Sequence, residues 1–321
     1  MFESILEKFK ALLDKFGSLS IAEVVRCVCE LHRERCNAFE KFSHESKQRA
    51  KIESNSCIFN YVKQADKNED FFEQINRLHG QIRLKHNQIF EDEVEYWKSE
   101  FAKVEREIAI KLKMRFNEKA IFMGSVKQDD QNHEIRWIVI EVDLEKKLAT
   151  LLSVNAVGLS MFHKSGCTDI EPEDEWGCAE SACSWSASDI RNYLNGSFYK
   201  EVFSDNEKNV IVNTYRHVNK GDYLIPSDCV TDCVKLLTLD EFYSLDNSEK
   251  KCSSIKDNKT WWLCEQKARG WADTDEPPQI YAVDCMSGEL LSHSPDTLSN
   301  LRISITVKLD DIMAFVNADD I

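Results

Sequence analysis

The chain has 321 residues, 42% of them hydrophobic, and a formal net charge of −15 at pH 7. This length allows two domains with packed cores. Residues 1–118 carry 21 basic and 21 acidic side chains, which leaves 20 basic and 35 acidic ones for the remainder, so all of the net charge lies in the second part. An acidic second domain repels phosphates and anionic lipids, which excludes nucleic acid and membranes as partners.

The start of the chain and its cysteines indicate a reducing compartment. No basic and apolar signal peptide opens the sequence, and no apolar run approaches the roughly 18 residues of a membrane span. The 12 cysteines are spread through a chain large enough to have its own core, which is typical of reduced, buried thiols. We therefore expect a cytoplasmic protein.

A metal site is the alternative role for some of these thiols. In one group, the side chains of Cys29, His32 and Cys36 would share a helix face. Two further pairs of cysteines are less closely clustered. None of the groups has the two closely spaced ligand pairs of a zinc site, so we expect no bound metal and no other cofactor. The groups are Cys27, Cys29, His32 and Cys36; Cys178 and Cys183; and Cys229 and Cys233.

Helical periodicity dominates the first 118 residues. An apolar stripe begins at Phe2 and stops at Gly17-Ser18, and a second stripe runs from Ile21 to Phe42. Residues 43–68 are charged and serine-containing, and they form either a polar helix or a connection. A third element extends from about Phe71 to Phe116 without a proline.

The third element carries the seam of a coiled coil. Its apolar residues follow one another in steps of four and three, and such a stripe must be buried against something. We expect an intramolecular bundle with the first two helices, and the alternative is self-association, or binding of a partner, through residues 71–116. The seam consists of Phe90, Val94, Trp97, Phe101, Val104 and Ile108.

After Ile121 the periodicity becomes that of strands. The runs 135–142 and 148–154 predict a hairpin, and later strands are expected at 261–265, 279–284 and 301–309. The last of these should have one buried and one exposed face, because its apolar residues alternate with polar ones. The segments 155–184 and 266–300 are expected to be mainly long loops around these strands. Residues 311–321 form a tail, and Asp319-Asp320-Ile321 at its end are expected to be frayed.

Three capping boxes predict short helices between these strands. They pair Ser186 with Asp189, Ser204 with Glu207, and Thr238 with Glu241. The first of these helices should bury Ile190 and Leu194 next to Trp185, and Asn195-Gly196 should end it. These three buried residues are therefore structural candidates.

Several of these segments also carry a family resemblance over about residues 121–310. The pattern Trp-x-x-Ser-x-Ile-Arg-x-Tyr-Leu-Asn-x-x-Phe-Tyr from Trp185 to Tyr199 is followed in order by Phe203-Ser204, Val234 to Glu241, Trp261-Trp262-Leu263 and Leu301 to Ser304. Together they resemble the prokaryotic family called domain of unknown function 6273. That family is related to the formylglycine-generating-enzyme branch of the C-type-lectin fold and to ligand-binding variable proteins of diversity-generating retroelements.

The resemblance implies a fold and one structural residue. We expect an α+β protein with an N-terminal α-helical bundle or coiled coil, residues 1–118. A C-type-lectin-like domain with antiparallel strands, short helices and long loops follows at residues 121–310. The usual Val-Arg-Pro turn of the family reads Leu301-Arg302-Ile303 here. Only Arg302 is kept, and we interpret it as structural, bonding loop carbonyls or an acidic residue.

Candidate ligand-binding residues are aromatic, since tryptophan and tyrosine are common anchors of interfaces. Trp176, Trp271 and Tyr281 lie in or next to expected loops. Neighbouring residues of a strand face opposite sides, so one ring of the pair Trp261-Trp262 should be in the core while Trp262 lines a ligand face. Calcium on the acidic loops around Asp169 to Glu175 and Asp273 to Glu276 is the weaker alternative, and solvated loops are expected instead.

These features favour a non-enzymatic recognition module that binds a protein or small ligand through its loops and is tethered or oligomerised by its helices. The family kinship implies a place in a prokaryotic conflict or signalling system, and a protein partner is expected. No hydrolase, phosphate-loop or dinucleotide motif is present. One alternative is a formylglycine-generating-type oxidase that uses two of Cys252, Cys264 and Cys285, although their surroundings do not resemble that enzyme's motifs. The other is a structural adaptor that acts through its helices alone.

Overall fold

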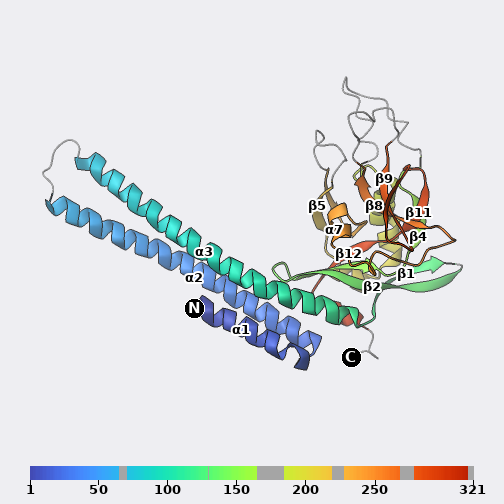
Figure 1. Ribbon diagram of the computed structural model, residues 1–321, viewed down its shortest axis with the longest axis horizontal. Coiled ribbons are helices and arrows are strands. Elements are labelled where there is room, and N and C mark those ends of the chain that lie inside the picture. The colour runs from blue at the N-terminus through green and yellow to red at the C-terminus, as the bar shows by residue number, and fades with distance from the viewer. Residues whose placement is uncertain (65–70, 129, 165–183, 219–227, 268–277, 317–321) are drawn as a thin grey trace, which may run out of the picture. The chain divides into compact units, whose positions relative to one another are not determined.

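The computed structural model describes residues 1–64, 71–128, 130–164, 184–218, 228–267 and 278–316, and for 58–64, 71, 72, 216–218, 228 and 229 only the backbone. It divides into two compact units, Met1–Lys111 and Leu112–Ile321. Helices occupy the chain up to Asn117, and mostly antiparallel sheets with short helices follow (Figure 1). The predicted α+β class, with a helical region before an antiparallel domain, is confirmed.

The first unit consists of three helices. Helix α1 spans Phe2–Lys15, α2 spans Ile21–Gln64 and α3 spans Phe71–Asn117, so the charged residues 43–64 continue α2 as a polar helix. A 3-10 turn at Phe16–Ser18 ends the first helix, where Gly17-Ser18 predicted a stop. Helix α2 then starts on a capping box, because Ser20 and Glu23 bond each other's backbone N–H groups at 2.8 and 3.2 Å.

The apolar stripe of α3 packs on the two preceding helices. The Phe2 ring lies 4.6 Å from that of Phe39 and 5.4 Å from that of Trp97, and the fully buried Phe101 is 5.8 Å from Phe9. The Arg35 guanidinium donates to the Glu105 carboxylate across the α2–α3 contact. This packing is intramolecular, as expected for a bundle, and α2 and α3 run antiparallel in it (Figure 1).

The second unit contains two five-stranded sheets and a two-stranded one. The first sheet has the order β1-β2-β3-β12-β7, the second β10-β9-β8-β11-β4, and β5 pairs with β6. All pairings are antiparallel except that of β11 with β8. The strands are β1 Ile121–Gln128, β2 Gln131–Asp143, β3 Leu148–Ser153, β4 Gly158–Met161, β5 Thr214–Val218, β6 Asp228–Asp232, β7 Val234–Lys235, β8 Thr260–Gln266, β9 Ile280–Asp284, β10 Leu290–His293, β11 Leu298–Leu301 and β12 Ser304–Lys308.

Short helices connect these strands. Two of the predicted capping boxes are confirmed: Ser204 with Glu207 starts α6, and Thr238 with Glu241 starts α7. The helices are α4 Asp189–Tyr193, a π-helical turn Leu194–Phe198, α5 Tyr199–Val202, α6 Asp205–Val210, α7 Leu239–Tyr243 and a 3-10 turn Ile312–Phe315.

The helix after Trp185 differs from its prediction at both ends. Ser188, not Ser186, is the N-cap and accepts the Arg191 N–H, while the Asp189 carboxylate accepts the Lys164 N–H instead of reaching back along its own helix. The helix does not stop at Asn195-Gly196 but continues through the π-helical turn into α5. The Asn195 side chain holds this turn against the sheet, because it accepts the N–H groups of Cys233 and Val234 and donates to the Val234 carbonyl.

The predicted single strand 301–309 is wrong, because the chain changes sheets within it. Strand β11 ends at Leu301 in the second sheet, and β12 begins at Ser304 in the first. Both faces of β12 are covered, since Ser304, Ile305, Thr306 and Val307 are all buried, and the expected exposed face is absent from it. The segment 286–300, expected to be a loop, contains β10 and most of β11.

The end of the described chain is packed onto the first sheet. Ile312 is fully buried in its 3-10 turn, and Val316 bridges Ile121 at the start of β1. Residues up to Val316 are therefore packed on the sheet, and the residues expected to be frayed, Asp319 to Ile321, lie outside the described residues.

A buried carboxylate fixes the helical segment 185–202 to the strands. Asp232 is 1% exposed and accepts hydrogen bonds from the Trp185 indole at 2.8 Å, from Arg191 Nε at 2.7 Å and from the Asn195 amide at 3.3 Å. A buried charge is stable only when it is paired and hydrogen-bonded in this way.

We predict that Asp232→Asn lowers the free energy of unfolding by about 2–4 kcal/mol, because it leaves the Arg191 charge without its carboxylate and removes an acceptor. Urea denaturation of the full chain measures this. Asp130→Asn is the matched control, since the Asp130 side chain is 97% exposed and should change stability by less than about 0.5 kcal/mol. Equal effects of the two variants would contradict the assigned role of Asp232.

Candidate functional site

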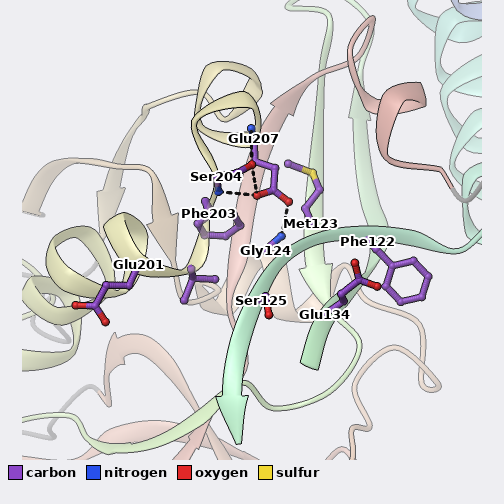
Figure 2. A pocket seen from close by; sticks show the side chains of 10 residues that line it. Phe122, Met123, Gly124, Ser125, Glu134, Glu201, Phe203, Ser204 and Glu207 are labelled. Atoms are coloured by element: carbon purple, nitrogen blue, oxygen red, sulfur yellow. Dashed lines mark hydrogen bonds between the residues drawn. The ribbon is translucent and has the colours of Figure 1, made fainter. Parts of the chain in front are cut away.

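A pocket of about 340 Å³ lies between strand β1 and the segment joining α5 to α6. Apolar side chains and three carboxylates line it (Figure 2). The lining residues are Phe122, Met123, Gly124, Ser125, Glu134, Glu201, Val202, Phe203, Ser204 and Glu207. Met123 and Phe203 are almost completely buried, and we call these two lining residues the floor of the pocket.

Gly124 shapes the wall of this pocket. Its backbone is left-handed, with φ of +74°, at an irregularity where the β1–β2 register shifts between Phe122 and Ser125. A Cβ atom there would lie 2.9 Å from the Phe203 ring and from the Val202 side chain, closer than real contacts allow. Only glycine fits both the conformation and the space.

Glu207 joins the two walls of the pocket, and both of its carboxylate oxygens accept hydrogen bonds. One carboxylate oxygen accepts the N–H and the hydroxyl of Ser204, both at 2.7 Å, as part of the α6 capping box. The other oxygen accepts the Gly124 N–H at 2.6 Å (Figure 2). Glu207 is therefore a structural residue that locks β1 to α6.

The other two carboxylates of the pocket are available to a ligand. Glu134 on β2 and Glu201 on α5 are both exposed. Two carboxylates beside an apolar floor suit a group that combines a positive charge with an alkyl or planar stem, such as a guanidinium or an ammonium side chain.

The predicted ligand-binding aromatics are not gathered in one described place. Trp176 and Trp271 lie outside the described residues. Trp262 is completely buried, donates its indole N–H to the Ser160 carbonyl at 3.0 Å, and packs against Phe162 and His293. Tyr281 is half-buried and packs on the opposite side of the sheet, against the core cluster that contains Trp261.

The expectation that one ring of the pair Trp261-Trp262 is exposed is thereby corrected. The two rings do face opposite sides of β8, but both sides are covered, and both rings are 0% exposed. The sequence could not show this because the covering residues, such as Phe162 and Phe242, come from distant segments.

The structural candidates are all buried. Trp185, Ile190 and Leu194 lie in the core at 1% exposure or less. Arg302, also 1% exposed, donates to the carbonyls of Ser153 and Glu249 and places its guanidinium 5.1 Å from the centre of the Trp261 ring. Burial lowers the pKa of Arg302 to about 10, so that it keeps its charge at neutral pH.

Two thiols meet close to this arginine. The Sγ atoms of Cys252 and Cys285 are 3.7 Å apart, and either thiol can donate in this contact. The bond from the Cys285 thiol, together with the Arg302 charge, lowers the pKa of Cys252. The same contact, with burial, raises the pKa of Cys285. Cys264, the third cysteine of the oxidase alternative, is buried and donates its backbone N–H to the Leu237 carbonyl at 3.0 Å.

The described residues show no metal-binding arrangement at the groups considered from the sequence. The His32 ring contacts Cys36 at 3.7 Å and Arg35 at 2.8 Å, and a guanidinium so close competes with a cation at that ring. In the part of the chain that the structure describes, no group of three or more His, Cys, Asp and Glu side chains is placed to hold a metal ion. The acidic loops, Cys178, Cys183 and the side chain of Cys229 lie outside what is described.

The pocket was not predicted from the sequence. Its walls are 83 residues apart in the chain, and the Glu207–Gly124 bond joins them. One signal was present, since an isolated glycine in a strand pattern indicates a bulge or a close backbone approach.

Among the described helices, none has an apolar stretch long enough to cross a membrane.

Fold and pocket together define an α+β protein with a helical unit and a β-sheet unit that carries an acidic-rimmed pocket. A family model described as "Domain of unknown function (DUF6273)" matches residues 160–279. This match supports the family resemblance for the central part of the second unit. No curated protein and no solved structure matches the chain.

We predict that Gly124→Ala lowers the free energy of unfolding by about 1–3 kcal/mol, because alanine meets both the positive φ and the Phe203 ring. The midpoint of urea denaturation measures the loss. Gly196→Ala is the control, since a Cβ at Gly196 meets nothing within 4 Å and a helical alanine is favoured. A Gly124→Ala variant as stable as Gly196→Ala would show that β1 tolerates a side chain there.

Proposed function

We propose that the chain is a non-enzymatic recognition module. Its second unit binds a protein or small ligand, and its N-terminal helices tether or oligomerise it. The motif resemblance and the family match at residues 160–279 support a C-type-lectin-like fold for the second unit. The same kinship favours a place in a prokaryotic conflict or signalling system.

The observation that carries this proposal is the pocket beside β1. Its floor is made rigid by the Glu207–Gly124 bond and by buried aromatic packing, while Glu134 and Glu201 stay exposed at its rim. A preformed, partly apolar hollow with a few polar groups is the usual form of a ligand site. Glu207 uses both carboxylate oxygens in structural hydrogen bonds, so it is not placed to react with a ligand.

The charge of the chain favours a cationic ligand. The sequence after residue 118 holds 35 acidic against 20 basic side chains, so its field attracts positively charged partners. A basic side chain of a protein partner would place its stem on the apolar floor and its charge between the two free carboxylates. We therefore expect a protein with an exposed basic segment to be the partner.

A full-length binding assay tests this function. The chain is titrated with an array of short Arg- and Lys-containing peptides and with the same peptides carrying Asp in those positions. Binding is expected only for the basic set, and Glu134→Gln with Glu201→Gln should weaken it by about two- to thirtyfold, as expected for two exposed ion pairs. Glu145→Gln, an exposed residue outside the pocket, is the matched control.

Two outcomes would contradict the proposed site. One is equal binding of the basic and acidic peptides. The other is a loss of affinity in Glu145→Gln as large as that in the double pocket variant.

Self-association through the helices is proposed from side chains that the bundle leaves uncovered. Ile52 on α2 and Leu84 and Ile89 on α3 are more than half exposed. Single exposed apolar side chains are common on monomers, so these three residues form a contact surface only where a second copy of the chain covers them. If they form one, Leu84→Lys with Ile89→Lys shifts the full chain toward monomer in sedimentation velocity at the same concentration, whereas Lys98→Ala, an exposed polar position, does not. An unchanged association state in the double variant would contradict this surface.

A second candidate function, a formylglycine-generating-type oxidase, is favoured by the 3.7 Å contact of Cys252 with Cys285. In that branch a cysteine pair works with copper. Titration of the reduced full chain with Cu(I) against a competing chelator separates the candidates. A stoichiometric complex that Cys252→Ser abolishes supports the oxidase, and the absence of a complex supports the recognition module.

A further inference from the structure

The two thiols at Cys252 and Cys285 are placed so that they can become covalently joined. Their Sγ atoms are 3.7 Å apart, and the Cys252 N–H donates to the Cys285 carbonyl at 3.1 Å, so the two backbones lie next to each other. A disulfide needs an S–S distance of about 2.0 Å and Cα atoms within roughly 4.4–6.8 Å, which neighbouring hydrogen-bonded backbones satisfy. Small side-chain rotations therefore suffice to close the bond.

The surroundings of the pair give its two members different roles. Cys252 is half-buried and can be reached from solvent, whereas Cys285 is 1% exposed. The Arg302 guanidinium favours the thiolate of Cys252, and the Cys285 thiol supplies it with a hydrogen bond. The amide of Asn300 lies 3.6 Å from Cys285 Sγ and helps to fix that sulfur. An accessible thiolate next to a buried second thiol is the arrangement of redox-sensitive cysteines.

We propose that Cys252 and Cys285 form a reversible dithiol–disulfide pair, in which Cys252 reacts first with a peroxide and Cys285 resolves the product. The Cys252 thiolate attacks a peroxide oxygen, the O–O bond breaks, and the leaving hydroxide takes up a proton to give water. Cys285 then attacks the sulfur of the resulting sulfenic acid, the S–S bond forms, and a second water leaves. The two thiols lose two electrons and two protons, and hydrogen peroxide is reduced to two waters.

The disulfide would tie a surface segment to the core. Hydrogen bonds tie residues 249–252 to this part of the core: from Arg302 to the Glu249 carbonyl, from the Trp261 indole to the Lys250 carbonyl at 3.2 Å, and from the Cys252 N–H to the Cys285 carbonyl at 3.1 Å. The new bond joins this segment covalently to the end of β9. Oxidation thus makes covalent a contact that is non-covalent in the reduced chain.

The two other described cysteines of the β-sheet unit are less suited to this chemistry. Cys233 donates to the Asn213 side chain at 2.7 Å, and burial raises its pKa, which disfavours its thiolate. Cys264 is buried in β8. Selective oxidation of the Cys252–Cys285 pair is therefore expected at peroxide levels that leave these thiols reduced.

The experiment treats the reduced full chain with hydrogen peroxide, blocks the remaining thiols by alkylation, and maps the digested peptides by mass spectrometry. The expected result is one linkage between the Cys252 and Cys285 peptides. It should form at least about tenfold faster than any oxidation at Cys233, and dithiothreitol should reverse it. In Cys285→Ser, Cys252 should stop at a sulfenic acid that dimedone traps, and Cys233→Ser should behave as the unchanged chain.

Three results would overturn the proposal. The first is a set of disulfides that involve other cysteines in preference to this pair. The second is a Cys252 thiol that remains reduced, and is therefore alkylated, after Cys233 has been oxidised. The third is an amount of dimedone adduct at Cys252 that is no larger in Cys285→Ser than in the unchanged chain. None of these results bears on the pocket beside β1, because the peptide titration tests the recognition function separately.

Discussion

The β-sheet unit depends on one buried cation at the point where the chain passes from one sheet to the other. Strand β11 ends at Leu301 and β12 begins at Ser304, so Arg302 and Ile303 make the crossing. Neutral carbonyls of Ser153 and Glu249 and the face of Trp261 surround the guanidinium. A charge in this position is stable only with these partners, so the two sheets and the segment at Glu249 are fixed together.

Hydrogen-bonded carboxylates likewise position two of the short helical segments against strands. Asp232 anchors the segment that begins at Trp185, and Glu207 anchors α6 to Gly124 on β1. These helices are too short to be stable by themselves, so a hydrogen-bonded charge that also reaches a strand decides their position. The pocket is a result of this arrangement, since the Glu207–Gly124 bond sets the separation of its walls.

What the sequence predicted well was local. The capping boxes at Ser204 and Thr238, the end of α1 and the strands β2, β8 and β9 follow from residues within a few positions of each other. The box at Ser186 failed because Ser188 offers the same hydroxyl two residues later, and the Asp189 carboxylate found a better partner in the Lys164 N–H. Local sequence patterns cannot show which of two possible N-caps is used when a residue distant in the chain, here Lys164, bonds the carboxylate.

What the sequence could not predict was long-range. The crossing at Arg302 looked like one continuous strand, because the alternation of Leu301, Ile303 and Ile305 is unchanged by a switch of sheets. The pocket joins segments that only folding brings together, and the burial of Trp262 depends on Phe162, far away in the chain. The aromatic residues proposed as anchors were chosen by type alone, and type does not determine exposure.

The central claim is that the second unit recognises a ligand on a rigid surface without reacting with it. Hydrogen–deuterium exchange of the full chain, with and without the tightest-binding basic peptide, tests this most directly. The account predicts slower exchange confined to the backbone of residues 121–126 and 201–207, with peptide and protein masses unchanged after incubation. Slower exchange elsewhere only, or a covalent change in either partner, would contradict it.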